Sequence, residues 1–251
     1  MLVTFLSQEV FAHLWVFARL GTALMLMIGI GDSYVSPRIR LTFALLLSFV
    51  IRPVVDIPVY PDSPIMIVMV MAKEVLIGLF FGMIARLIMG IMDVAGSMIG
   101  AQIGLGSAML FNPAMIQQTG VITVFMTVVA VTAVMVTDLH HLGLIALVDS
   151  YHLFNMKAPL MMGDMTYALL KLADQTMVIG LQLAAPLVVM GLIFNLGVGI
   201  LARLMPQIQI FFISVPLQIG FGFLALMMAS AVIIRVFLGG YEDIYQGAGN
   251  F

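Results

Sequence analysis

The sequence of 251 residues contains no cysteine. Disulfide bonds, thiolate nucleophiles and cysteine-based metal or iron–sulfur sites are therefore excluded, while the redox compartment stays open. The chain also has no HExxH, GxSxG or GxxxxGKS/T pattern, so metalloproteases, nucleophile-elbow hydrolases and P-loop ATPases lack their required residues. We therefore expect a protein that is not an enzyme and that needs no cofactor.

Charge is scarce as well. Only 9% of the residues are charged and the formal net charge is −2, which gives no basic surface for nucleic acid. No Lys/Arg cluster suited to anionic lipid is visible either. In contrast, 63% of the residues are hydrophobic and the mean hydropathy is +1.20. These values lie far outside those of soluble globular domains, so the sequence predicts an all-α integral membrane protein.

Apolar segments of about the length of a membrane helix, roughly 20 residues, recur along the chain. Turn-like links separate these segments, and the link from Arg52 to Pro64 is rich in proline. We expect one membrane-embedded helical domain over residues 1–251, with a short tail at residues 239–251 and a first helix that is not a cleaved signal peptide. The predicted helices are Val10 to Ile30, Arg40 to Val55, Ile65 to Met92, Val121 to Thr137, Thr176 to Ala202 and Ile208 to Leu238.

Two other features qualify this scheme. The part from Asp164 to Asp174, in the most polar region of the chain, is expected to be a short interfacial or surface helix. The positive charges divide evenly between the two sides of a six-helix arrangement, so they do not decide the orientation.

The stretch AGSMIGAQIGLGSAMLFNP, from Ala95 to Pro113, combines a glycine ladder with helix-breaking residues. Gly96, Gly100 and Gly104 fall four apart, so on a helix they form a groove where another backbone can approach closely. Polar, non-helical backbone at membrane depth must be buried in protein or line a water-filled path. We therefore expect this stretch to be the working part of the protein. A second ladder with the same spacing lies at Gly78 and Gly82.

Charged residues also occur inside apolar segments, where a bare charge at the bilayer centre costs at least ~2.5 kcal/mol. Lys73 and Glu74 are neighbours on a predicted helix, so their side chains diverge and are expected to reach different partners. Burial in an assembly interface is one interpretation, and an interfacial pair that snorkels to water is the other. The charges in question are Arg19, Lys73, Glu74 and Arg86.

Prolines interrupt the last two apolar segments, at Pro186 and Pro216. Each proline removes a backbone hydrogen bond and is expected to kink its helix. Paired interruptions of this kind are typical of a functional cavity, although a simple packing kink explains them equally well.

One group of residues has the ligand types of a zinc site. Its spacings match no closed metal site, and His140 and His141, as neighbours, are expected to point apart. We therefore predict polar contacts at the end of a segment, and no metal site. The group consists of Asp138, His140, His141, Asp149 and His152.

Four stretches, in this order, resemble the FliR family of flagellar export proteins and its type III secretion relatives. The first is KEVLIGLFFG from Lys73, and the second is the glycine-rich stretch from Ala95. DLHHLGLIALVDSYHLF follows from Asp138, and RLMPQIQIFFISVPLQIGFG follows from Arg203. The resemblance covers residues 14–237. One departure is Asn112, where the family pattern has aspartate before the proline.

The resemblance implies a subunit of the bacterial flagellar export gate, built from helical hairpins in a hetero-oligomer. It implies one copy together with P-type and Q-type subunits and other flagellar export membrane proteins, located in the inner membrane at the flagellar basal body. The assembly would surround a pore for unfolded flagellar export substrates. The alternative is a small-molecule or ion-coupled secondary transporter, in which the broken helices and Glu74 form the site.

The resemblance also implies roles for individual residues. It assigns a pore plug to the loop Gly106, Ser107, Ala108, Met109, Leu110, Phe111, Asn112, Pro113, Gln117 and Gln118. In agreement with the resemblance, we expect a further set of residues to take part in helix packing and subunit contacts, namely Gly78, Gly82, Gly96, Gly100, Gly104, Arg203, Pro206, Gln207 and Pro216.

Overall fold

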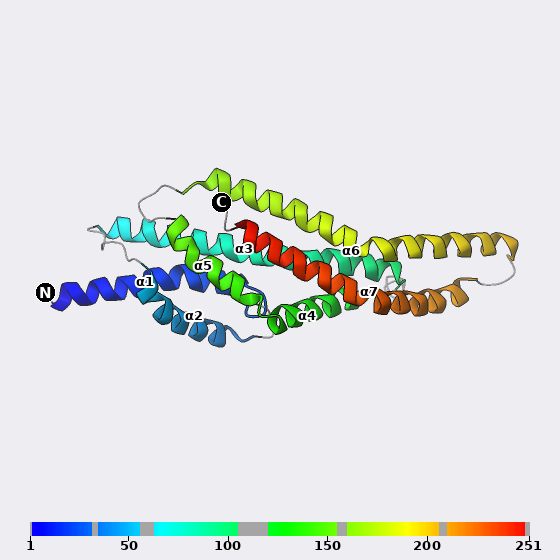
Figure 1. The fold of residues 1–251 in the computed structure, drawn as a ribbon, viewed down its shortest axis with the longest axis horizontal. Helices are drawn as coiled ribbons and strands as arrows, with labels where there is room; N and C mark the ends of the chain where they lie inside the picture. The colour runs from blue at the N-terminus through cyan, green and yellow to red at the C-terminus, as the bar shows by residue number, and fades with distance from the viewer. Residues whose placement is uncertain are drawn as a thin grey trace. The chain divides into compact units, whose positions relative to one another are not determined.

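The fold is known from a computed structural model, which describes residues 2–31, 35–55, 63–104, 120–154, 160–205 and 210–248. This part of the chain is helical and contains no strand (Figure 1), which confirms the predicted all-α class. The helices are α1 Leu2–Leu26, α2 Pro37–Ile51, the short 3-10 helix η1 Arg52–Val54, α3 Pro64–Gln102, α4 Val121–Val136, α5 His140–Leu153, α6 Met162–Leu204 and α7 Ile210–Ala248.

Four of the described helices, α1, α3, α6 and α7, are long and apolar enough to cross a membrane. The consecutive helices α4 and α5 together make a fifth candidate, as one broken span. The span predicted at Arg40 to Val55 is not found, because α2 has only 15 residues and ends at Ile51. Pro53 lies in the 3-10 turn that follows, and its missing N–H cannot continue the helix.

Helices α3, α6 and α7 are longer than the sequence suggested, and α3 ends at Gln102 instead of Met92. The predicted surface helix at Asp164 to Asp174 is instead the first part of α6, which runs without interruption for 43 residues. Only Gln175 separates the two parts, and neither proline nor glycine occurs between Asp164 and Ile179, so nothing ends the helix there. Helix α7 likewise continues into the expected tail, as far as Ala248, and buries Tyr241 and Tyr245.

The contacts divide the chain into two compact units. Unit 1 consists of Met1–Ile88, Met135–Ala173 and Glu242–Phe251, and unit 2 consists of Met89–Val134 and Asp174–Tyr241. Each unit therefore combines segments that are far apart in the sequence. That the whole chain acts as a single membrane-embedded domain stays a prediction.

In unit 1, the glycines of α3 allow α1 to approach closely. A Cβ atom placed on Gly78 would lie 2.3 Å from the carbonyl oxygen of Arg19, and one on Gly82 would lie 2.8 Å from the Cβ of Leu26. A side chain at either position would require α1 to move away. The spacing of glycine on α3 therefore sets how near α1 can come.

In unit 2, the three glycines of the other ladder differ from one another. A Cβ on Gly96 would lie 2.7 Å from the backbone Cα of Thr123 on α4, whereas one on Gly100 would lie at an ordinary 3.6 Å from Ile122. Gly104 lies beyond the end of α3, with φ at +85°, a conformation that favours glycine. The ladder thus comprises a close approach, an ordinary contact and a turn.

These distances predict opposite effects for two equivalent substitutions. Gly96→Ala should lower the stability by about 1–3 kcal/mol, because its methyl group overlaps backbone that cannot rotate away. Gly100→Ala should be neutral or stabilising by about 0.5–1 kcal/mol, because alanine is the better helix former. The thermal midpoint of each variant in native membranes, where the apolar helix faces stay covered, measures the difference. Equal midpoints would show that α4 does not approach α3 as closely at Gly96 as described.

Candidate functional site

An ion pair lies in the interior of unit 1, between Arg19 on α1 and Glu74 on α3. The Nε atom of Arg19 donates a hydrogen bond of 2.6 Å to Oε2 of Glu74. Neither side chain has any exposed surface. Either charge alone would be costly in such surroundings, so each depends on the other for compensation.

The same arginine also contacts α5. Its Nη1 donates to Oγ of Ser150 at 2.9 Å, and its guanidinium lies 3.9 Å from the centre of the Tyr151 ring. The Tyr151 hydroxyl in turn donates to the backbone oxygen of Val16, at 3.2 Å. Arg19 therefore joins three helices, because its planar guanidinium offers several donors and a face for aromatic stacking.

The local sequence explains why the arginine points inward. Trp15 lies one turn before Arg19 on the buried face of α1, and the guanidinium lies 5.7 Å from the centre of its ring. On α3, Gly78 follows Glu74 by one turn. Because α1 reaches the backbone of α3 at Gly78, the short side chain of Glu74 can meet Arg19 directly.

Oε1 of Glu74 and Nε1 of Trp15 are both buried and make no hydrogen bond of good geometry, although the Trp15 indole interacts with the Glu74 carboxylate. Such atoms carry a desolvation cost that the ion pair must outweigh. The cluster is therefore better suited to fixing which helices pack together than to adding stability.

The sequence analysis grouped three charges as buried. The structure places these charges in different environments. Glu74 is buried, Lys73 is half-buried, and Arg86 is exposed on the single chain, so burial of Arg86 in an assembly interface stays a prediction. Arg86 follows Leu79 and Met83 along the outward face of α3, at helical spacing, and all three are exposed. Sequence reasoning noted Arg19 but did not pair it with Glu74, although their opposite charges in two apolar helices were the available signal.

The end of α3 in unit 2 is held by α7. The side-chain Nε2 of Gln218 donates to the backbone oxygen of Gln102 at 2.8 Å, which satisfies one of the carbonyls that a helix end leaves free. A Cβ on Gly104 would lie 3.1 Å from the same glutamine side chain. Pro216, one of the residues expected in packing, lies inside α7 two positions before Gln218.

Several predicted site residues cannot be placed. The plug loop from Gly106 to Gln118 lies outside the described residues, as do Pro206 and Gln207. Arg203 lies in the last turn of α6 and is exposed.

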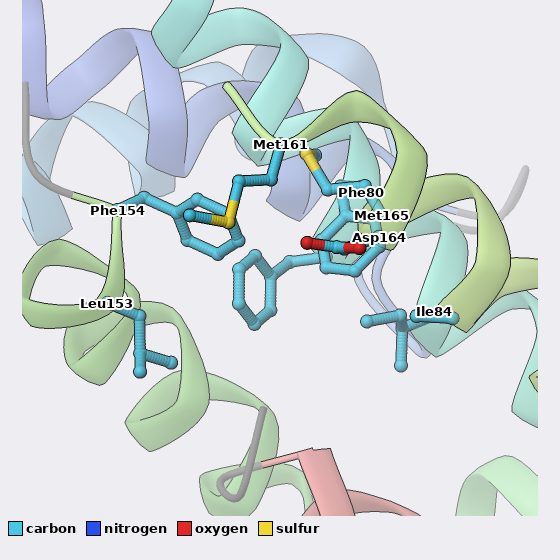
Figure 2. A pocket seen from close by; sticks show the side chains of 9 residues that line it. Phe80, Ile84, Leu153, Phe154, Met161, Asp164 and Met165 are labelled. Atoms are coloured by element: carbon cyan, nitrogen blue, oxygen red, sulfur yellow. The ribbon is translucent and has the colours of Figure 1, made fainter. Parts of the chain in front are cut away.

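A small pocket of about 160 Å³ lies in unit 1, lined mainly by aromatic, methionine and aliphatic side chains (Figure 2). Asp164 is the one charged residue in its wall. Sites for small molecules usually measure about 300–1,000 Å³ and gather several polar groups. The pocket therefore gives no support to a transported solute. Its lining is Phe80, Phe81, Ile84, Leu153, Phe154, Met161, Asp164, Met165 and Ala168.

The apolar surfaces of α6 and α7 are largely uncovered. In the most apolar window of each helix, 28% of α6 and 22% of α7 is buried, against 61% of α3. Ile193, Leu196 and Ile200 mark an outward stripe on α6, each more than 60% exposed. Such surfaces need lipid or other protein chains to cover them.

Taken together, the long apolar helices, the ion pair between helices and the uncovered helix faces define a polytopic membrane protein suited to assembly with other chains. The family described as Bacterial export proteins, family 1, matches residues 10–244. The chain belongs to this family.

Individual relatives agree along nearly the whole chain. Flagellar biosynthetic protein FliR of Caulobacter vibrioides is 36% identical over 238 residues, which cover 94% of this chain and 95% of the relative. The protein of the same name from Escherichia coli is 31% identical, with 88% and 83% covered. That from Bacillus subtilis is 28% identical, with 90% and 88% covered.

Membership of this family identifies the protein as a subunit of the flagellar type III export apparatus. It is a membrane-embedded component that works with other membrane components of that apparatus. The alternative of a small-molecule or ion-coupled transporter is thereby overturned. Glu74, which that alternative used as an ion-coupled site, is the partner of Arg19.

The ion pair predicts a non-additive pattern of mutational effects. Arg19→Met and Glu74→Leu should each destabilise the protein by about 3–5 kcal/mol, because each leaves one buried charge without its partner. The double variant should lose less stability than the sum of the two single losses, because it leaves no buried charge without a partner. Thermal unfolding in native membranes and motility of complemented cells measure these losses.

Glu242→Leu is the matched control, because Glu242 is an exposed glutamate on α7. Its effect should stay within about 0.5 kcal/mol. If the single variants at Arg19 and Glu74 behaved like this control, or if their losses simply added, the two residues would not be energetically coupled.

Proposed function

We propose that the protein is a structural and gating subunit of the flagellar export gate, without enzymatic activity. It forms part of the pore through which unfolded flagellar proteins cross the bacterial inner membrane. Its partners are P-type and Q-type gate subunits, and it acts in the basal body as one membrane-embedded helical domain.

The observation that carries this proposal is the uncovered apolar surface of α6 and α7. Less than a third of each helix's most apolar window is buried within the chain, although family membership makes the protein part of an apparatus of several components. In a bilayer, association depends on close packing. At Gly197, Gly199 and Gly220, no atom beyond the backbone of the same helix lies within 4 Å of the position that a Cβ atom would take, so the backbone there is open to a partner helix. These two helices are therefore the surfaces that we assign to partner subunits.

The plug role of Gly106 to Gln118 is part of the same proposal and rests on the sequence. A passage for unfolded polypeptide must not bind any side chain strongly, and glycine, serine, methionine and amide groups meet that need. An apolar constriction also holds back water and ions when no polypeptide is present. The contact of Gln218 with the end of α3 supports a fixed starting point for this loop.

The assembly role predicts that the chain needs different partner chains for its stability. When expressed alone, it should be recovered in low yield and should aggregate in detergent, because its apolar helix faces stay open. Co-expression with the P-type and Q-type subunits should give a monodisperse complex in higher yield. A stable, monodisperse chain whose yield did not change on co-expression would contradict the proposal.

A deletion in the loop distinguishes a plug role from a scaffold role. Removing Ser107 to Leu110 should leave the complex assembled but make the closed gate leaky, because a steric barrier is lost while Gly96 still packs on Thr123. Ion flux in cells, measured beside the amount of intact complex, distinguishes the two roles. An intact complex of normal tightness would refute the plug, and loss of the complex would favour a scaffold.

A further inference from the structure

The break between α4 and α5 brings together three side chains that can bind a metal ion. Helix α4 ends at Val136 and α5 begins at His140. Between them, Asp138 adopts a positive φ of 58°. Aspartate tolerates this conformation better than most residues, and the turn places its side chain beside the first turn of α5.

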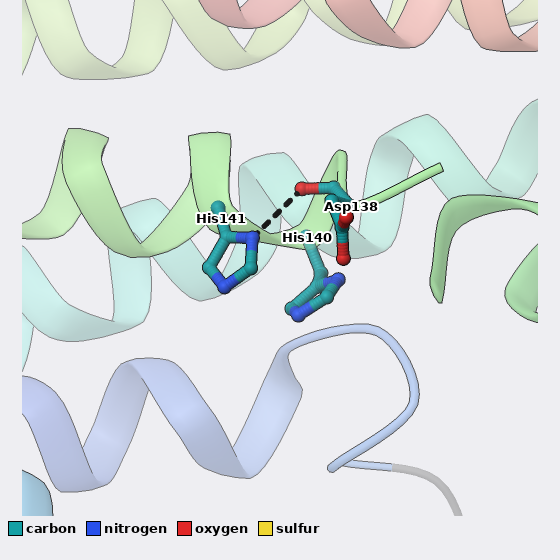
Figure 3. Close-up of side chains that lie close together, drawn as sticks. All are labelled: Asp138, His140 and His141. Carbon is teal, nitrogen blue, oxygen red and sulfur yellow. Dashed lines mark hydrogen bonds between the residues drawn. The ribbon is translucent and has the colours of Figure 1, made fainter. Parts of the chain in front are cut away.

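The sequence suggested that the side chains of His140 and His141 point apart, but in the structure they lie close together. Their ring centres are 4.2 Å apart, with 32° between the ring planes. One ligand atom from each of Asp138, His140 and His141 lies within 4.8 Å of the others (Figure 3). Neighbouring side chains can converge in this way at a helix start, because no preceding turn restricts them. Asp149 and His152, which the sequence grouped with them, are not in this cluster.

The hydrogen bonding of the two histidines suits a ligand role. Nδ1 of His141 lies 3.1 Å from the backbone oxygen of Asp138, and a proton donated there leaves Nε2 free to bind a cation. Metal-binding histidines typically donate their other ring nitrogen in this manner. In addition, Nδ1 of His140 is buried and has no hydrogen-bond partner. An unsatisfied buried nitrogen of this kind calls for a water or an ion.

We propose that Asp138, His140 and His141 form a three-ligand site for a divalent transition metal of the zinc class. Two imidazole nitrogens and one carboxylate oxygen favour zinc or its neighbours over magnesium and calcium, which take oxygen ligands. With bonds of about 2.1 Å, tetrahedral ligand atoms stand about 3.4 Å apart, so the side chains close by roughly an ångström on binding. Water completes the coordination.

The consequence is local and structural. The ion joins Asp138, in the break, to the first turn of α5, and so holds the conformation of residues 137–139. The carboxylate offsets part of the ion's charge, and the exposure of Asp138 and His141 on the single chain leaves the site accessible to an ion. The site is separate from the Arg19 and Glu74 pair and does not depend on the proposed function.

The test measures zinc bound to the full chain within its export complex, purified with an affinity tag that contains no histidine. After removal of metal with a chelator and dialysis against Zn²⁺, the wild-type complex should hold one more ion per copy of this chain than the His141→Gln complex. In the Asp138→Asn complex, the affinity for that ion should be at least about tenfold lower than in the wild type. Loss of even an outer-shell partner typically lowers metal affinity by at least that factor.

His152→Gln is the matched control, because it removes an exposed histidine from the same helix. It should leave zinc binding unchanged, and all variants should elute and unfold like the wild type in the presence of chelator. If His141→Gln failed to assemble, His140→Gln would give the same comparison. Equal zinc content in the wild type and the ligand variants would overturn the proposed site. So would a loss of zinc in His152→Gln as large as that in the ligand variants.

Discussion

The ion pair between Arg19 and Glu74 is the constraint on which unit 1 depends. Both side chains are fully buried, so neither charge can be left alone without a large loss of stability. The arginine also holds Ser150 and Tyr151, which fixes α5 beside α1 and α3. Apolar helices in a bilayer have little hydrophobic reason to choose one neighbour over another. A buried pair of opposite charges supplies that choice.

Close backbone approach supports this arrangement. The absence of a side chain at Gly78 brings the backbone of α1 near enough for Glu74 to reach Arg19. In unit 2, Gly96 serves a comparable purpose against Thr123, while Gly104 allows the chain to turn after α3. Glycine therefore has two separate physical roles here, one in packing and one in backbone conformation.

Much of the remaining apolar surface has no partner within the chain. Helices α6 and α7 are the clearest cases, because the mean hydropathy of their most apolar window equals that of α3, which is far better covered. The difference follows from how the chain distributes its contacts, because α3 takes part in the close packing of both units. An export subunit that surrounds itself with other chains needs such open faces.

The sequence by itself determined the helical membrane class and the family, because composition, the length of apolar segments and the order of four motifs are properties of the chain alone. It also marked Glu74 and the glycine ladders as unusual. It did not reveal that Arg19 is the partner of Glu74, that Arg86 faces outward, or that Asp138 joins His140 and His141. Those outcomes depend on helix rotation and on one positive φ, and only the tertiary structure fixes them.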